Sequence, residues 1–411
     1  MAVVMQHTTK GRSGMDPRGR TLAAWLDLVG WPNIVTRTPE QARIDYQILV
    51  ATTTRRTIGG WSRSTIASSP EGHEVPVRVY WPRRRRIGAP IVVWMHGGGF
   101  VIGDLFTADA TCRKLANYSS AVVVSVDYRR SPEVPITQSH EDARTAIAWA
   151  YRHAAQLGAD RRRLIVAGDS AGGNMAAAAC CHFRDHAGAG IAGQILIYPA
   201  TDLTLAHMDH TAASGFFDGA AIEWFGLHSL TGIERTDPTI SPLFADSHAG
   251  LPPAHIVLGG ADPFCPDGRA YARALEAAGN QVLCEEFPRQ MHGFVDMDGI
   301  FPSGHSALKS IAETVAGVSP VPGGVPTVPD HPIRWYSLAA ETERRLDESW
   351  LRTPMANTAR ILSTLAAERW RGPRISPVRA LTRSTQSKKH RLALDETSTG
   401  HTTDATAVTN D

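Results

Sequence analysis

Hydrophobic residues along the chain gather in short runs that alternate with longer stretches of helical spacing. The runs are rich in Val and Ile and lack clean polar alternation, which is typical of strands buried on both faces of a parallel sheet. These runs lie at residues 77–81, 91–95, 121–126, 164–167, 194–198, 255–258 and 281–287. Helix-sized stretches at residues 141–157, 171–183 and 268–278 separate the later runs. The order predicts an α/β fold with a mainly parallel sheet flanked by helices.

Two apolar stretches do not fit this alternation. Residues 21–51 have helical spacing, and residues 203–230 interrupt the strand series with several aromatic side chains. Two interpretations of both stretches stay open, a lid over the open end of the sheet and peripheral packing helices.

The pattern changes after residue 317. Residues 319–330 hold four prolines and two glycines, which favours an extended linker because Pro interrupts both helices and central strands. Leu338, Thr342, Leu346 and Trp350 recur every four residues, and a second amphipathic stretch follows at residues 361–370. Residues 371–391 then carry seven Lys or Arg and no acid. We expect the final forty residues to be disordered.

Composition and charge narrow the class of protein. The chain has 411 residues with 43% hydrophobic and 20% charged residues, which is ordinary globular usage but too long for one usual domain. A formal net charge of +2 is too small for a phosphate-binding surface, so a nucleic-acid partner is not expected. No run approaches the roughly 18 apolar residues of a membrane span, and the N-terminus has no signal-peptide core. The expectation is a soluble, cytoplasmic protein.

The five cysteines do not form a recognisable site. Their number is odd, Cys180 and Cys181 are adjacent, and none has metal-ligand spacing. We therefore expect reduced, mostly buried thiols and no metal site.

Residues 168–172 read GDSAG, directly after one apolar run and before an alanine-rich helical stretch. This is the strand, turn and helix context of the G-x-S-x-G nucleophile motif, in which the serine lies on a strained turn. Gly168 and Gly172 leave room where the strand and helix backbones converge. Ser170 is therefore the candidate nucleophile, and an ordinary glycine-rich turn is the less favoured alternative.

A serine nucleophile needs a base and an acid that orients this base. Asp262 follows the run at 255–258 and His292 follows the run at 281–287, so both are predicted beyond strand ends at the edge where Ser170 lies. The chain order Ser, Asp, His is typical of this motif. Two competitors are less favoured: Asp267, which precedes a glycine and is predicted to be a helix N-cap, and His305, predicted in a loop or cap.

The sequence HGGGF at residues 96–100 follows another strand-like run. Successive glycines let backbone N–H groups face a ligand, and the N–H of Ala171 lies next to the nucleophile, so an oxyanion site is predicted. The competing phosphate cradle is disfavoured because neither GxxxxGK[ST] nor GxGxxG is present.

Four motifs together resemble the hormone-sensitive lipase-like branch of the α/β-hydrolases. They are HGGGF at 96–100, GDSAGGN at 168–174, ADP at 261–263 and MHGF at 291–294, in that order. The resemblance covers roughly residues 61–317. It implies an α/β-hydrolase fold with an eight-stranded, mostly parallel sheet and a helical cap.

The resemblance also implies roles for particular residues. Ser170 would be the nucleophile, Asp262 the acid and His292 the base. The implied oxyanion donors are the backbone N–H groups of Gly98, Gly99 and Ala171. The histidine of the glycine motif, His96, would be structural.

The implied domain organisation has four parts. Residues 1–60 would contribute to the cap, and residues 61–317 would form the catalytic domain, with a cap insertion at about 203–235. A Pro-rich linker at 318–331 leads to a C-terminal extension at 332–411. In the cap, Phe216, Phe217 and Trp224 are the predicted substrate-binding residues.

The predicted function is that of a serine carboxylesterase or lipase acting on short- to medium-chain acyl esters through an acyl-enzyme, without a metal or organic cofactor. An amidase or deacetylase with the same triad is one alternative, and a non-catalytic ligand-binding receptor is another. A small-molecule ester is the expected partner. Peripheral contact of the C-terminal extension with an anionic membrane is the alternative to a solvated tail. The sequence leaves the oligomeric state open.

Overall fold

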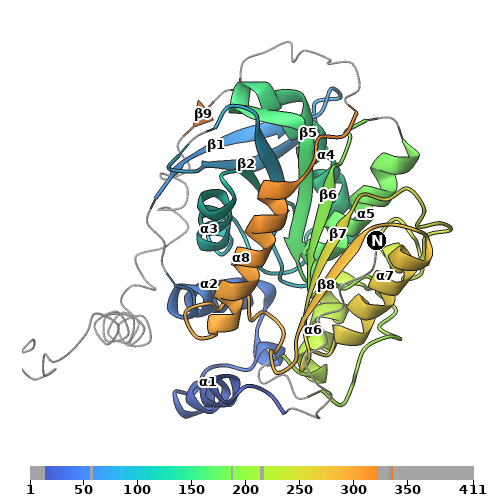
Figure 1. The fold of residues 1–411 in the computed structure, drawn as a ribbon. Helices are drawn as coiled ribbons and strands as arrows, with labels where there is room; N and C mark the ends of the chain where they lie inside the picture. Colours follow the sequence, from blue (N-terminus) through green and yellow to red (C-terminus); the bar gives the residue numbers. More distant parts are fainter. Residues whose placement is uncertain are drawn as a thin grey trace, which may run out of the picture. The chain divides into compact units, whose positions relative to one another are not determined.

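A single mixed sheet forms the centre of the molecule (Figure 1). The computed structural model describes residues 14–55, 59–84, 86–186, 188–212, 217–322, 333 and 335–336. Across the sheet the strands are ordered β8-β7-β6-β5-β3-β4-β2-β1-β9. Their bounds are β1 Trp61–Ser68, β2 Glu74–Trp81, β3 Ala89–Met95, β4 Val122–Val126, β5 Ala159–Asp169, β6 Gly193–Ile197, β7 Ala254–Gly259, β8 Val282–Phe287 and β9 Trp335–Tyr336.

Strands β3 to β8 are parallel, whereas β1, β2 and β9 join in antiparallel pairs. The prediction of a mainly parallel sheet is therefore confirmed. The ninth strand, β9, is a two-residue addition beside β1. Strand β1 had no counterpart among the predicted runs, because its sequence WSRSTIAS is largely polar and only some of its positions are buried.

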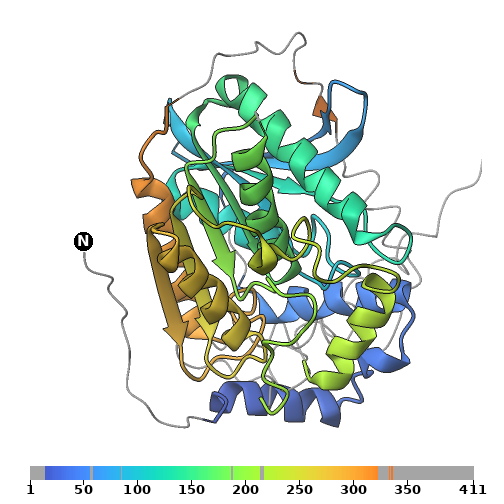
Figure 2. The same ribbon diagram turned by 90° about the vertical axis from the view of Figure 1, so that its right-hand side faces the viewer.

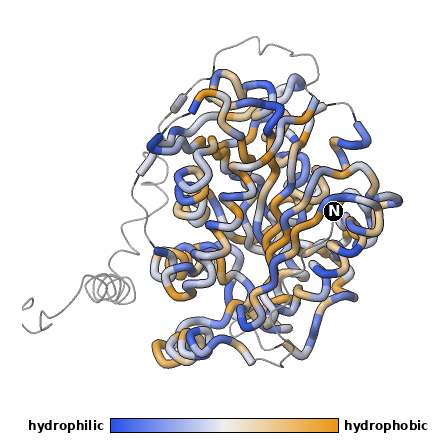
Figure 3. Tube along the Cα trace, viewed as in Figure 1, coloured by the Kyte–Doolittle hydropathy of each residue, from blue (hydrophilic) through white to orange (hydrophobic). Residues whose placement is uncertain are grey.

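Both faces of the sheet are covered by helices, and neighbouring residues of β3 show why. Val93 belongs to one hydrophobic cluster and Trp94 to the other, since successive side chains of a strand point to opposite faces. Every residue of β3 is buried. The hydrophobic residues accordingly concentrate along the central strands in Figure 3.

One face packs against α4 (Ile136–Leu157), α5 (Ala171–Asp185) and α7 (Cys265–Ala277). The other face packs against α3 (Asp109–Ser119) and α8 (Pro302–Gly317). Four of the five cysteines are buried among these elements, and Cys284 is half-buried. None of the helices in the described ranges combines the length and the apolar character needed to cross a bilayer.

The N-terminal segment and α6 (Gly219–Ser229) lie together at the end of the molecule to which the parallel strands point (Figure 2). The segment contains α1 (Pro17–Leu28), a 3-10 turn η1 (Ile34–Thr36) and α2 (Pro39–Thr53). A capping box at Thr38 and Gln41 begins α2. A further 3-10 turn, η2, spans Pro242–Phe244. The expected amphipathic stretches after residue 337 and the basic stretch at 371–391 lie outside the described residues.

Candidate active site

Ser170 lies on the sharp turn between the end of β5 and the start of α5. Its backbone has φ 55° and ψ −116°, a conformation that strains any residue with a Cβ atom. The end of β5 and the start of α5 approach closely at this turn, because a Cβ atom on Gly168 would lie 2.4 Å from the carbonyl carbon of Gly172. A Cβ atom on Gly172 would in turn lie 2.0 Å from the carbonyl oxygen of Met95, at the end of the neighbouring strand β3. The glycine spacing of the motif is thus explained by backbone contact.

Ser170, His292 and Asp262 form a hydrogen-bonded chain. Nε2 of His292 is 2.9 Å from Oγ of Ser170, and Nδ1 of His292 is 2.8 Å from Oδ2 of Asp262. The other carboxylate oxygen of Asp262 accepts the backbone N–H of Phe264 at 2.8 Å. All three polar side chains belong to buried residues. These distances allow proton transfer from the hydroxyl to the imidazole.

Aromatic rings surround the imidazole of His292. The ring of Phe217 stacks on it with centroids 4.3 Å apart, and the rings of Tyr198 and Phe264 lie at 4.7 Å and 5.5 Å. The imidazole is therefore held by packing as well as by its two hydrogen bonds.

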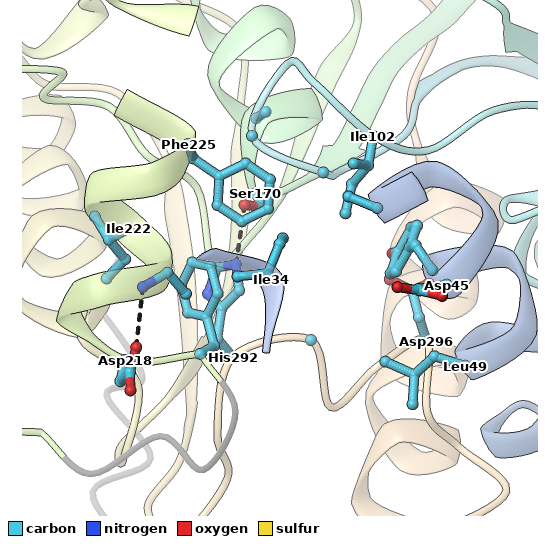
Figure 4. A pocket seen from close by; sticks show the side chains of 18 of the residues that line it. Ile34, Asp45, Leu49, Ile102, Ser170, Asp218, Ile222, Phe225, His292 and Asp296 are labelled. Carbon is cyan, nitrogen blue, oxygen red and sulfur yellow. Dashed lines mark hydrogen bonds between the residues drawn. The ribbon is translucent and has the colours of Figure 1, made fainter. Parts of the chain in front are cut away.

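One cavity of about 370 Å³ connects the candidate residues. Ser170, His292, Gly98, Gly99 and Ala171 all line it. Much of the remaining wall is apolar and comes from the N-terminal segment and α6. Polar side chains also line it, among them Asp45, Asp218 and Asp296 (Figure 4). Apolar members labelled in the figure are Ile34, Leu49, Ile102, Ile222 and Phe225. An apolar cavity with a few convergent polar groups is typical of small-molecule sites.

Comparisons with known proteins identify the family to which the chain belongs. The family described as alpha/beta hydrolase fold matches residues 92–296. Esterase LipI of Mycobacterium tuberculosis is 41% identical over 239 residues, which cover 57% of this chain and 75% of LipI. Carboxylesterase NlhH of the same organism is 40% identical over 240 residues, again 57% and 75% of the two chains. The chain belongs to the α/β-hydrolase fold family.

Solved structures match a larger share of the chain than these sequence relatives do. A hyperthermophilic esterase from the archaeon Pyrobaculum calidifontis is 30% identical with a TM-score of 0.67, covering 74% of this chain and 98% of that one. An α/β hydrolase enzyme from the metagenome of Lake Arreo is 33% identical with a TM-score of 0.69 and the same coverage. The chain is accordingly a carboxylic-ester hydrolase of the serine carboxylesterase type, in the hormone-sensitive lipase-like group.

In this hydrolase the predicted substrate-binding residues lie in different places. Phe217 lines the cavity, whereas Phe216 lies outside the described residues. Trp224 does not line the cavity. Its buried side chain packs between α6 and the N-terminal segment, and its indole N–H donates to the carbonyl oxygen of Arg37 at 3.2 Å. Phe225, one position further along α6, lines the cavity instead.

Helical spacing in the sequence could have predicted which face of α6 lines the cavity. Ile222, Phe225 and Ser229 recur at i, i+3 and i+7 and all line the cavity, as residues on one face of a helix do. Trp224 was predicted as a substrate-binding residue because of its large aromatic side chain, but it lies on the adjacent face of α6.

The two competing residues have other contacts. The predicted N-cap role of Asp267 is wrong: the N-cap of α7 is Phe264, and Asp267 lies in the first turn. Its buried carboxyl group accepts the backbone N–H groups of Thr201 and Asp202 at 2.7 and 3.2 Å. His305 lies in the first turn of α8, edge-on to Tyr118. Neither residue lines the cavity.

His96 also lies outside the cavity lining. One of its ring nitrogens, Nδ1, is 2.8 Å from the carbonyl oxygen of Gly97, and its ring stacks on Tyr128. Burial lowers the pKa of His96 to about 4, so its imidazole is neutral near pH 7. Within the described part of the chain, no cluster of three His, Cys, Asp or Glu is arranged to hold a metal ion.

Proposed function

We propose that this hydrolase cleaves short- to medium-chain acyl esters through a Ser170–His292–Asp262 triad and an acyl-enzyme. The observation that supports the proposal is the continuous hydrogen-bonded chain of these three side chains at the wall of the apolar cavity.

In the first step, Oγ of Ser170 attacks the ester carbonyl carbon while Nε2 of His292 takes the hydroxyl proton. Asp262 accepts the Nδ1–H of His292, which holds the imidazole in the required tautomer and stabilises the imidazolium that forms. The oxyanion of the tetrahedral intermediate accepts the backbone N–H groups of Gly98, Gly99 and Ala171. One such donor contributes about 3 to 4 kcal/mol to lowering the barrier.

The first tetrahedral intermediate then collapses. His292 donates the same proton to the departing alkoxide oxygen, so that the alcohol leaves and the acyl group stays on Ser170. His292 then takes a proton from water, and the resulting hydroxide attacks the acyl carbonyl. Collapse of the second intermediate breaks the bond to Oγ and returns the proton to Ser170.

The N-terminal segment and α6 are proposed to act as a cap on this chemistry. They supply much of the apolar wall, and they pack on each other through Ala42 and Trp224, with Ile102 from the loop after the glycine motif in the same cluster. A volume of about 370 Å³ lies at the lower end of the range for small-molecule pockets, which favours short and medium acyl chains over long ones.

The test uses p-nitrophenyl esters of increasing acyl length and a fluorophosphonate probe. We expect wild-type protein to be labelled on Ser170 and to be most active on short and medium chains. Ser170→Ala should be neither labelled nor active, whereas His305→Ala, a matched histidine control away from the cavity, should keep its activity. Near wild-type turnover by folded Ser170→Ala would contradict the proposal. Matched ester and anilide substrates separate an esterase from an amidase.

A further inference from the structure

Two carboxyl groups meet at the wall of the cavity beside the nucleophile. Asp169 is the last residue of β5 and directly precedes Ser170, while Asp296 lies four residues after His292. Both line the cavity, and their side chains are hydrogen-bonded to each other. Asp169 is buried and Asp296 is half-buried. Neither belongs to the triad or to the oxyanion donors.

Each carboxyl group has further partners in a different segment. Oδ1 of Asp169 accepts the backbone N–H of Gly97 at 2.8 Å. Asp296 accepts the hydroxyl groups of Thr111 at 2.9 Å and Tyr198 at 3.3 Å. The neighbouring ammonium group of Lys114 on α3 binds Asp298 instead, at 2.6 Å.

A hydrogen bond between two carboxyl groups requires one proton, and two ionised carboxylates in contact would repel each other. Burial raises the pKa of Asp169 well above its usual range, and the contact with Asp296 raises it further. Asp296 also has a raised pKa through burial, but the hydrogen bonds it accepts from Thr111, Asp169 and Tyr198 favour its ionised form. The proton therefore belongs on Asp169.

We propose that protonated Asp169 is a positioning residue that ties the glycine loop at 97–99 to the loop that carries His292. Oδ1 of its side-chain carboxyl group accepts the backbone N–H of Gly97, and the O–H of the same carboxyl group donates to Asp296. One hydrogen-bonded chain thus joins the oxyanion donors, the nucleophile turn and the base loop, which must keep a fixed geometry during acyl transfer. This inference rests on the proposed function.

Ionisable groups on every neighbouring element face the pair. Burial raises the pKa of the tyrosines and of the cysteine among them, so these stay neutral near pH 7. The pair then carries a single negative charge beside these neutral tyrosine and cysteine side chains, with Asp104 and the Lys114–Asp298 ion pair also nearby. The facing groups are Tyr46 on α2, Asp104 after the glycine loop, Cys112 and Lys114 on α3, Tyr128 after β4, and Tyr198 after β6.

Two substitutions of Asp169 separate the positioning role from side-chain volume. In Asp169→Asn the amide oxygen can accept from Gly97 and the amide N–H can donate to Asp296, which reproduces the protonated acid. We expect its kcat on p-nitrophenyl butyrate to match that of the wild type. Asp169→Leu has a similar shape but neither hydrogen bond, and its kcat should fall by about 100-fold with little change in KM.

The proton itself has an infrared signature. The difference spectrum between wild type and Asp169→Asn at pH 7 should contain the carbonyl stretch of one protonated carboxylic acid. Asp298→Asn is the matched control, because Asp298 pairs with Lys114 and its substitution should remove no such band.

The inference is overturned if Asp169→Leu keeps wild-type kcat, if Asp169→Asn loses as much as Asp169→Leu, or if no acid band disappears. If Asp169→Leu does not fold, the activity of Asp169→Asn and the infrared band still decide. Fluorophosphonate labelling of wild-type Ser170 separates the two proposals. Failure to label contradicts the proposed function, whereas labelling together with any of these three results overturns only the role of Asp169.

Discussion

The ring of Phe217 lies nearly parallel to the imidazole of His292, with centroids 4.3 Å apart and planes inclined by 14°. Phe217 lies two residues before α6, whereas His292 follows β8, so a residue next to α6 contacts the candidate base directly. The contact restricts rotation of the imidazole between Ser170 and Asp262. The packing of the segment before α6 and the alignment of the candidate base are therefore coupled through this pair.

Phe217→Ala should lower kcat/KM by about 2- to 10-fold, because an aromatic pair contributes roughly 0.5 to 1.5 kcal/mol beyond its buried area. Phe217→Tyr keeps the aromatic face and should stay close to the wild type. Steady-state kinetics with a short-chain aryl ester measure both. Equal kcat/KM values for the Ala and Tyr variants would show that the stack has no part in aligning His292.

The glycine loop meets α6 at one close contact. A Cβ atom on Gly99 would lie 2.4 Å from Cδ1 of Phe225, and Gly99 has φ +57°. Gly99→Ala should therefore displace either the loop or the ring, and we expect a loss in kcat/KM of up to about 100-fold. Phe225→Ala introduced as well should restore part of this loss by removing the clash, leaving the smaller strain of a non-glycine residue at positive φ.

The double-mutant cycle provides the control for this prediction, since it measures the interaction between the two sites directly. If the losses in kcat/KM of the two single variants simply add in Gly99→Ala/Phe225→Ala, Phe225 does not limit the space beside the loop. Thermal unfolding of each variant checks that the fold is kept.

The proximity of the three candidate triad residues could be predicted because their sequence signals are local. Ser170 stands in a motif whose glycines are required by backbone contact, and Asp262 and His292 each follow a strand-like run. Parallel strands bring their carboxyl ends to one edge, so three separated loops could be assigned to one site without any knowledge of side-chain packing.

Features that depend on tertiary packing were not predictable in the same way. The contact of α6 with the N-terminal segment decides which face of α6 lines the cavity. The sequence therefore led to Trp224 as a substrate-binding residue, whereas Phe225 lines the cavity wall. Strand β1 has no apolar run that would mark it as a strand, and it forms by pairing with β2. The partner of Asp169 could not be found from sequence, because Asp296 comes close only once the base loop is folded.

The two-residue strand β9 should stabilise the edge of the sheet. Trp335 pairs with Thr65 of β1, and its ring lies 5.4 Å from that of Trp81. Trp335→Ala in the full chain should lower the free energy of unfolding by about 1 to 2 kcal/mol, with esterase activity unchanged. Trp335→Phe is the matched control and should recover most of the loss. A chain ending at residue 322 that is as stable as one ending at 336 would contradict a role for β9.

Asp267 should make stability depend on pH. Burial raises the pKa of its carboxyl group to about 7, despite the hydrogen bonds from Thr201 and Asp202. In the unfolded chain the pKa is about 3.9. Between these values the folded protein keeps a proton that the unfolded chain has released, so the free energy of unfolding falls as pH rises. The contribution is full below about pH 4 and is lost by about pH 7, a change of up to about 4 kcal/mol.

Asp267→Asn removes this titration while keeping the hydrogen bonds of the protonated acid. The amide oxygen can accept from the two backbone N–H groups, and the amide N–H can donate to the hydroxyl group of Thr201. Urea unfolding of both proteins at a series of pH values should show the variant gaining stability relative to the wild type from pH 4 to pH 7, with a constant difference above that. Asp246→Asn, at an exposed position, should show no such drift. A difference that is independent of pH, or that shrinks as pH rises, would mean that Asp267 is ionised throughout and that its three hydrogen bonds outweigh its burial.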